Sequence, residues 1–446
     1  MTITPNSTQI YSSSQIEQSQ TQFNWQNCWY PISFIQDLPK DRPLGFSLYD
    51  EPFVIFRDGE GKLACLQDRC SHRAAKLSDG QILDGKIECL YHGWQFDRDG
   101  KCTKIPQLPR SAKTPQNSCV KSFSIVEKQG IVWMWRGKQE DADENLIPTV
   151  ADMDDPNFVS SDYTLDLPYD QSYFIENVVD PSHIFISHEA TFNARKAAQP
   201  LNMEILELNE RGFKGRYAIN IGSNSKWTDL NFIAPNLVNY RIVYPHKISG
   251  AILYSIPTGV GKCRIIIRNY TNKPGWKLKL QPRWMEHWYR SHFVEEDLSL
   301  VVGQQEEIKR LGKSLQELYL PLKTSDLFVV EYRRWLDKYG NSLPYYQGWT
   351  TSKTPTEVVQ DDQKPAPLDR LRRHTEICGS CSKAYENTIK VKQIGVGMAI
   401  AFAFIAILAD NSNIEITFVI LSLFSLGISL VAREIKTHFE KAYTRH

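Results

Sequence analysis

Two pairs of cysteine and histidine residues lie close together in residues 68–97. Cys70 and His72 are separated by one residue, and Cys89 and His92 are separated by two. Thiolates and imidazoles are ligands that soft and borderline transition metals prefer in proteins. A disulfide bond would use the two cysteines and leave the two histidines unexplained. We therefore expect a metal centre in this stretch.

The distribution of ligand types between the two loops indicates the kind of metal centre. A structural zinc ion accepts two Cys and two His, but such sites usually place ligands of one type in each loop. Here each loop carries one of each, as Cys-x-His and Cys-x-x-His. This arrangement is typical of a Rieske [2Fe-2S] centre, in which two thiolates hold one iron and two imidazoles the other. The motif alone leaves open whether the protein is an electron carrier or an enzyme.

A second group of potential metal ligands lies downstream, in the sequence ENVVDPSHIFISHE. His183 and His188 follow Asp180 in the pattern D-x-x-H-x-x-x-x-H. Non-haem Fe(II) prefers two His and one carboxylate on one face, with open positions for O2 and substrate. A His-x4-His pair by itself is usually structural, but the upstream Rieske motif and the neighbouring Asn177 and Asp180 favour a catalytic iron. We predict that His183 and His188 are two of its three ligands.

The loops CSHR and CLYHGW and the segment WQNCWYPISFIQDLP resemble those of the Rieske non-haem iron oxygenases. The resemblance implies an α+β fold class, with an N-terminal all-β Rieske domain followed by an α+β helix-grip catalytic domain built on an antiparallel sheet. It also implies two cofactors, one [2Fe-2S] cluster and one mononuclear non-haem Fe(II).

The same resemblance assigns roles to acidic residues around the iron. Asp180 is expected to act as a bridge in a head-to-tail homotrimer, where it accepts hydrogen bonds from His92 of the partner subunit and from an iron-bound histidine. In the sequence HFVEEDLSLVVGQQ the resemblance places the third iron ligand at Asp297, with Glu296 as the next candidate. The alternative for this stretch is a solvated acidic turn of a helix.

The C-terminal segment narrows the resemblance to one group within the Rieske oxygenases. The sequence RRHTEICGSC, followed by apolar residues, is similar to the pheophorbide a oxygenase group, and a cyanobacterial member is the simplest interpretation. The group's substrates include chlorophyll-derived tetrapyrroles. Cys378 and Cys381 form a Cys-x-x-Cys motif that by itself fits half a zinc site, a redox pair or two unrelated thiols. No second pair of ligands stands nearby in the sequence to complete a zinc site, and the resemblance makes the motif a redox-regulatory target of thioredoxin.

Two apolar runs, residues 394–409 and 416–432, carry no charged residue. Spanning a bilayer takes roughly 20 predominantly apolar residues, so flanking side chains must extend each run. Lysines and arginines flank the pair and the connecting loop is acidic, which predicts a multi-pass anchor in the thylakoid or plasma membrane, with the catalytic domains on the cytoplasmic side. Gly397 and Ala401 would allow close helix packing. The alternative is a buried helical hairpin at an oligomer interface.

The 446 residues carry a formal net charge of +1, which gives no electrostatic reason to expect nucleic acid as a partner. Composition and periodicity divide the chain into five zones. These are a disordered leader (1–22), the Rieske domain (23–136), the catalytic domain (137–346), a linker with the Cys-x-x-Cys motif (347–389) and a two-helix membrane anchor (390–446).

Together these features predict a monooxygenase that uses O2 on an apolar substrate, with dioxygenation as the near alternative. The sequence shows neither a nucleotide-binding G-x-G-x-x-G after a strand nor a plant-type ferredoxin motif. A separate ferredoxin with its reductase is therefore the expected electron donor. Two other functions stay open, namely a Rieske electron carrier and a membrane-tethered redox or translocon component without oxygenase activity.

Overall fold

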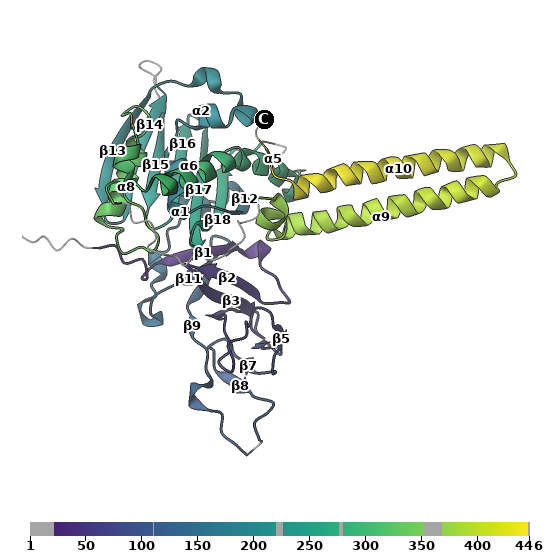
Figure 1. Ribbon diagram of the computed structural model, residues 1–446, viewed down its shortest axis with the longest axis horizontal. Coiled ribbons are helices and arrows are strands. Elements are labelled where there is room, and N and C mark those ends of the chain that lie inside the picture. The colour runs from purple at the N-terminus through teal and green to yellow at the C-terminus, as the bar shows by residue number, and fades with distance from the viewer. Residues whose placement is uncertain (1–21, 110, 220–225, 276–279, 352–367, 445–446) are drawn as a thin grey trace, which may run out of the picture.

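The computed structural model describes residues 22–109, 111–219, 226–275, 280–351 and 368–444. The predicted leader lies outside these residues apart from Gln22, as does part of the predicted linker. Figure 1 shows three parts: a group of small sheets, a larger sheet with helices against it, and a long helical hairpin.

The N-terminal part consists of three small antiparallel sheets. The first has the strand order β1-β11-β10, the second β2-β3-β4-β9 and the third β5-β6-β7-β8. The strands are β1 (Trp29–Phe34), β2 (Leu44–Leu48), β3 (Glu51–Arg57), β4 (Leu63–Gln67), β5 (Gln81–Leu83), β6 (Lys86–Glu88), β7 (Gln95–Phe96), β8 (Cys102–Lys104), β9 (Ser122–Phe123), β10 (Ile125–Lys128) and β11 (Ile131–Trp135).

The second part is a seven-stranded antiparallel sheet with the order β12-β18-β17-β16-β15-β14-β13. In β15 buried residues alternate with half-buried ones, as expected for a strand with one face toward a core. The strands are β12 (Val159–Leu167), β13 (Leu201–Asn209), β14 (Gly212–Ile219), β15 (Trp227–Ile233), β16 (Leu237–Tyr244), β17 (Lys247–Gly259) and β18 (Lys262–Thr271).

Helices pack against this sheet, and the predicted iron ligands lie at the ends of helices or between them. Helix α1 contacts the central strands β16 to β18, α8 contacts β13 and β14, and α5 contacts the edge strand β12. The helices are α1 (Gln171–Val179), α2 (Ile184–Ser187), α3 (Glu189–Phe192), α5 (Arg283–Glu295), α6 (Leu298–Leu311), α7 (Leu315–Leu318) and α8 (Leu327–Lys338).

The buried hydrophobic residues of the N-terminal part belong to two separate cores. The larger core joins β1 and β11 to the catalytic sheet, with Trp133 packed edge-on against Tyr254 at 5.3 Å between ring centroids. A smaller separate core, which includes Leu66 and Phe96, lies under the loops of the predicted cluster. The cluster loops therefore have a rigid support of their own, while the rest of the Rieske domain is fused to the catalytic domain.

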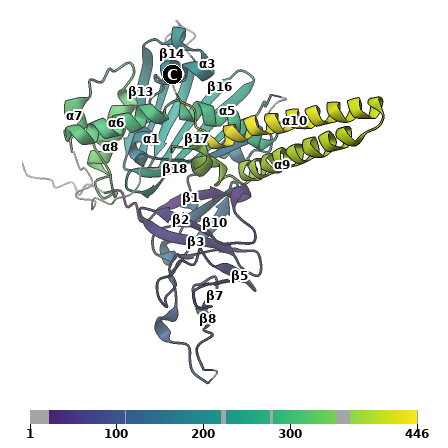
Figure 2. The ribbon, with the colours of Figure 1, turned by 45° about the vertical axis from the view of Figure 1, so that its right-hand side comes forward.

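The C-terminal hairpin consists of α9 (Gly379–Leu408) and α10 (Ser412–Glu440). Each helix is long and apolar enough to cross a membrane. In Figures 1 and 2 the two helices run side by side away from the body. Because α9 already begins at Gly379, its first turns occupy what the sequence assigned to a linker. The predicted order of an all-β domain, an α+β domain and two apolar helices is confirmed.

The contact between α9 and α10 uses other small residues than predicted. A Cβ added to Gly397 would meet open space, and Ala401 is exposed. Gly395 faces α10 instead, where an added Cβ would lie 3.0 Å from the carbonyl oxygen of Ser425. Ser422 donates a hydrogen bond to the carbonyl of Ala399 across the same contact. The prediction of Gly397 and Ala401 was wrong because the contacting face lies about half a turn away from them.

Candidate active site and its metal centres

The two predicted cluster loops have matching backbone turns. The amide of Ala74 donates to the carbonyl of Cys70 at 3.0 Å, and the amide of Gly93 donates to the carbonyl of Cys89 at 2.8 Å. Both donors adopt a positive φ, 59° at Ala74 and 73° at Gly93. A positive φ reverses the chain sharply after each cysteine. The two loops can therefore present their ligands to a common centre from opposite sides.

The thiols and the imidazoles of this group lie in different surroundings. Cys70 and Cys89 are each only 2% exposed, whereas His72 is exposed and His92 is half-buried. The two imidazole rings lie 4.5 Å apart, and the ring of His72 stacks on Trp94 at 4.7 Å. Two inner thiolates and two outer imidazoles are the donor set of a [2Fe-2S] Rieske cluster. The residues present therefore fit this cofactor, with its histidine side toward the surface.

The three predicted iron ligands come together in the catalytic domain. The Nε2 atoms of His183 and His188 lie 3.5 and 3.2 Å from one carboxylate oxygen of Asp297. His183 immediately precedes α2, His188 separates α2 from α3, and Asp297 lies between α5 and α6. The ligand atoms of all three gather within 4.8 Å of one another. Two imidazoles and one carboxylate on one side are the set that non-haem Fe(II) prefers.

The outer nitrogens of both histidines have partners that set their tautomers. Nδ1 of His188 contacts the carboxylate of Glu296 at 3.1 Å, and Nδ1 of His183 contacts the main-chain carbonyl of Asp180. Because both partners accept, Nδ1 of each ring carries the proton and Nε2 offers a lone pair toward Asp297. The carboxylate of Glu296, the second candidate for the third ligand, thus contacts Nδ1 of His188, on the side of the ring away from the predicted iron site. The carboxylate of Asp297 contacts Nε2 of the same ring.

Comparison with known proteins identifies the family of this chain. The family model described as the Rieske [2Fe-2S] domain matches residues 28–124, and the one described as pheophorbide a oxygenase matches residues 232–314. Protein TIC 55, chloroplastic, of Pisum sativum is 36% identical over 464 residues, which covers 96% of this chain and 84% of that protein. The chain is a Rieske oxygenase of the pheophorbide a oxygenase group.

Two further similarities cover most of this Rieske oxygenase. Pheophorbide a oxygenase, chloroplastic, of Arabidopsis thaliana is 29% identical over 461 residues, covering 95% of this chain and 84% of that protein. The crystal structure of dicamba monooxygenase bound to dicamba shares the fold, with a TM-score of 0.60 at 22% identity over 70% of this chain and 96% of that one.

Asn177 and Asp180 of this Rieske oxygenase lie beside the predicted iron ligands, at the end of α1. The amide of Asn177 donates to the ligand oxygen of Asp297 at 3.3 Å, and the carboxylate of Asp180 lies 3.9 Å from Nδ1 of His183. Burial raises the pKa of Asp180, although its contact with His183 and two hydrogen bonds from Ser182 oppose the shift. Burial would also raise the pKa of Asp297, but its contacts with the two histidines outweigh burial and lower it.

Two cavities meet at the iron ligands, and their walls differ in polarity. A cavity of about 360 Å³ extends from His183 and Asp297 toward the sheet, between apolar and aromatic side chains such as Phe174 and Phe293. A second hollow of about 470 Å³ also reaches these two ligands and is lined by four carboxylates, including that of Asp180, and by apolar side chains such as Val329. The ligands thus stand between an apolar chamber and an acidic hollow.

Cys378 and Cys381 lie in neither cavity. Both are buried and free of disulfide bonds, and they face His287 and His374. These two histidines were not predicted, because no second pair of ligands stands near the motif in the sequence. His374 precedes Cys378 by four residues, so the pattern H-x3-C-x2-C was a usable signal. His287 lies 87 residues before His374, and no local spacing marks it.

Proposed function

We propose that this Rieske oxygenase inserts one oxygen atom of O2 into an apolar, chlorophyll-derived tetrapyrrole, using electrons supplied by a ferredoxin and its reductase. The observation that carries the proposal is the apolar cavity that opens directly on His183, His188 and Asp297. A cavity of about 360 Å³ falls within the usual range for small-molecule sites. The similarity to pheophorbide a oxygenase supports a tetrapyrrole as the substrate class.

The residues of the chain would hold one [2Fe-2S] cluster and one iron ion, three irons in all. When bound, the mononuclear iron supplies O2 activation. The protein orients the ligands and excludes water. Glu296 holds the ring of His188, and the amide of Asn177 holds the carboxylate of Asp297. The aromatic walls of the cavity exclude water from the substrate side. Insertion of one oxygen atom, with the other leaving as water, takes two electrons and two protons, and dioxygenation stays the alternative outcome.

The acidic hollow supports the predicted electron path between subunits. In a head-to-tail homotrimer, His92 of the partner subunit would enter this hollow and donate to Asp180, which already lies beside His183. Leu90 and Tyr91, next to His92 in the chain, are each 60% exposed. Exposed apolar side chains beside a redox ligand suit a surface that becomes covered. We therefore keep the trimer and the Asp180 bridge as part of the proposal.

The hairpin supports a membrane location for the enzyme. Its apolar windows are only 11% buried, so most of their large apolar side chains face outward. Both ends of the hairpin lie at the body, which suits an anchor with the catalytic domains on the cytoplasmic side of a thylakoid or plasma membrane. A cyanobacterial source and thioredoxin-dependent regulation at Cys378 and Cys381 stay predictions.

Turnover with defined substrates tests the proposed function. Purified full-length protein would be incubated with ferredoxin, its reductase, O2 and a panel of chlorophyll-derived tetrapyrroles, and products would be identified by mass spectrometry after labelling with 18O2. We expect one labelled oxygen atom in a tetrapyrrole product. His183→Ala should abolish the product while the Rieske spectrum persists. Reduction of the cluster without product formation from any tetrapyrrole would favour the electron-carrier alternative.

A further inference from the structure

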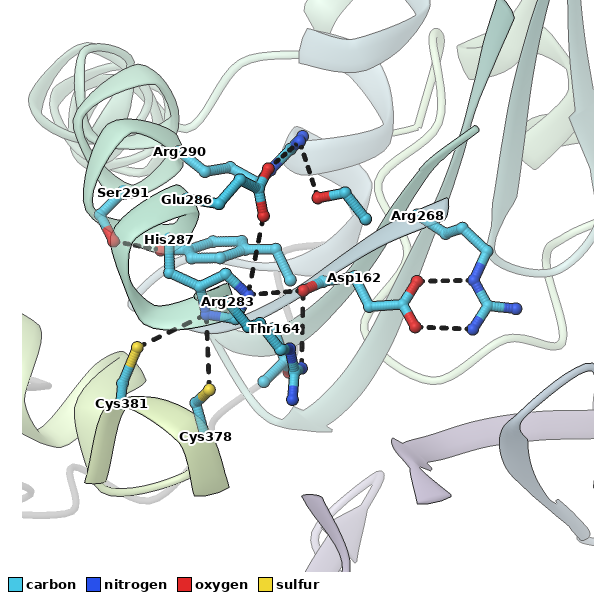
Figure 3. A network of polar contacts seen from close by, with 12 residues as sticks. Asp162, Thr164, Arg268, Arg283, Glu286, His287, Arg290, Ser291, Cys378 and Cys381 are labelled. Carbon is cyan, nitrogen blue, oxygen red and sulfur yellow. Dashed lines mark hydrogen bonds and ion pairs between the residues drawn. The ribbon is translucent and has the colours of Figure 1, made fainter. Parts of the chain in front are cut away.

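A second set of two cysteines and two histidines lies where the hairpin joins the catalytic domain. His287 belongs to α5, His374 to the π-helical turn Leu371–Thr375, and the cysteines to the start of α9. The potential ligand atoms of all four residues gather within 4.8 Å. Figure 3 shows the thiols of Cys378 and Cys381 pointing from α9 toward His287.

The distances within this set match the edges of a small tetrahedron. Nδ1 of His287 lies 3.2 Å from Nε2 of His374, and 3.4 and 3.5 Å from the sulfurs of Cys378 and Cys381. Nε2 of His374 lies 3.3 Å from the sulfur of Cys381. A tetrahedral zinc ion with bonds of about 2.0–2.1 Å to nitrogen and about 2.3 Å to sulfur implies ligand separations of about 3.3 Å between nitrogens and about 3.5 Å between nitrogen and sulfur.

The hydrogen bonds of the two rings determine which nitrogen of each ring faces the centre of the set without a proton. Nε2 of His287 lies 2.7 Å from the main-chain carbonyl of Asp162, and Nδ1 of His374 lies 2.6 Å from that of Thr164. A carbonyl only accepts, so these nitrogens carry the protons. Each neutral ring then turns an unprotonated nitrogen toward the other. With the two sulfurs at 3.3–3.5 Å, the two unprotonated nitrogens, 3.2 Å apart, form a set of four donors that one cation can share.

The surroundings suit a closed structural ion. His287 and Cys378 are 0% exposed, His374 1% and Cys381 2%. Two thiolates would balance the charge of one divalent cation, which removes the cost of burying them alone. The accepting carbonyls lie on β12, which among the described strands pairs with β18 alone, so the two histidines also occupy the free edge of the sheet. We propose that His287, His374, Cys378 and Cys381 bind one Zn²⁺ ion with tetrahedral geometry.

The zinc ion would fasten the hairpin to the body. Its four ligands join α5 and the segment that leads into α9, and their hydrogen bonds reach the catalytic sheet at β12. The amide of Gly379, next to Cys378, donates to the carboxylate of Asp37 in the Rieske domain at 2.9 Å. Arg283 on α5 also pairs with Asp37. The site therefore lies at a junction of the Rieske domain, the catalytic sheet and the hairpin.

Metal analysis of the full-length protein tests the proposal without relying on activity. Elemental analysis should find one zinc per chain in addition to iron. Zinc K-edge X-ray absorption should show two sulfur neighbours at about 2.3 Å and two nitrogen neighbours at about 2.0–2.1 Å. Because this measurement uses the unmodified chain, it does not depend on whether a variant folds. Zinc-free protein with a disulfide bond between Cys378 and Cys381, or iron in place of zinc, would overturn the proposal.

Variants locate the ion and test its role. Cys378→Ser should lose the zinc and keep the Rieske paramagnetic resonance signal, and limited proteolysis should release the hairpin several-fold faster. Cys263→Ser is the matched control, because Cys263 is also a fully buried cysteine but lies in β18, outside the set. It should keep both zinc and protease resistance. Full zinc content in Cys378→Ser, or equal loss in both variants, would refute the assignment.

Discussion

The protein contains two sets of two cysteines and two histidines, and their surroundings are opposite. In the Rieske set the thiols are buried and the imidazoles reach the surface. In the set at the hairpin base all four side chains are buried, and both imidazoles are tied to main-chain carbonyls. Within the described residues only the second set forms a group of ligand atoms inside 4.8 Å. A Rieske cluster needs no such single-ion group, because each of its two irons takes one pair of ligands.

This difference shows that ligand types alone do not determine what a metal centre does. Electrons must enter and leave a redox cluster, so one side of it has to approach a partner, and here that side carries His72 and His92. A structural ion needs no such access and gains from burial and from ligands drawn from several segments. The Rieske ligands come from 23 consecutive residues, whereas those at the hairpin base span residues 287–381. The first set can stabilise only its own loops, but the second can hold distant elements together.

The largest effect should come from replacing one histidine of each set with alanine. His72→Ala removes an iron ligand, so we expect loss of the Rieske paramagnetic resonance signal and of all oxygenation. His287→Ala should leave that signal intact and lower the zinc content instead. Spectroscopy and elemental analysis of the two variants would be compared side by side. Loss of the Rieske signal in both variants would mean that the two sets are not independent.

A smaller effect should follow from a substitution in the proposed electron path that leads from the Rieske set to the mononuclear iron. Asp180→Asn keeps the size of the side chain but removes its charge, so multiple-turnover oxygenation should fall roughly 10- to 100-fold while both iron centres stay bound. Stopped-flow reoxidation of the reduced cluster would measure the defect. Asp326→Asn is the control, because Asp326 lines the same hollow. Unchanged turnover in Asp180→Asn would contradict the bridge.

The smallest effect on the metal centres should come from removing the apolar part of the hairpin. Gly395 lies against Ser425 and Ser429, so a short Gly-Ser loop can join Gly395 to Ser429 in place of residues 396–428. We expect a protein that leaves the membrane fraction but keeps iron and zinc, because every proposed ligand precedes Gly395. Activity should fall only for substrates that partition into the bilayer. Aggregation of the shortened protein would favour the oligomer-interface alternative.

Local spacing explains which parts of the site were predictable from the sequence. The four Rieske ligands and the pair His183 and His188 stand in short motifs whose geometry is set by nearby residues. Asp297 required a resemblance, because the adjacent Glu296 has the same chemistry and only the turn between α5 and α6 decides which carboxylate faces the iron site.

The missed features depend on tertiary contacts. His287 meets Cys378 and Cys381 only because α5 packs both on the edge strand β12 and on α9. Helix α9 begins earlier than predicted. Its first turns are polar and include Lys383 and Glu386, and these charged residues were predicted to lie outside the hairpin. The order of domains was predictable because alternation and apolar runs persist over many residues.

The length of α9 has a consequence for how the enzyme would meet a bilayer. Its 30 residues form a rod about 45 Å long, whereas the hydrocarbon layer is about 30 Å thick. With the hairpin spanning a bilayer as proposed, about 15 Å of helix remains outside the hydrocarbon layer as a stalk, and the first turns of this stalk pack against the body at Trp284. A stalk fastened at its base is a rigid spacer, unlike a flexible tether that would let the body tumble. The height and orientation of the active site above the membrane would then be fixed, so substrate must always arrive from the same direction.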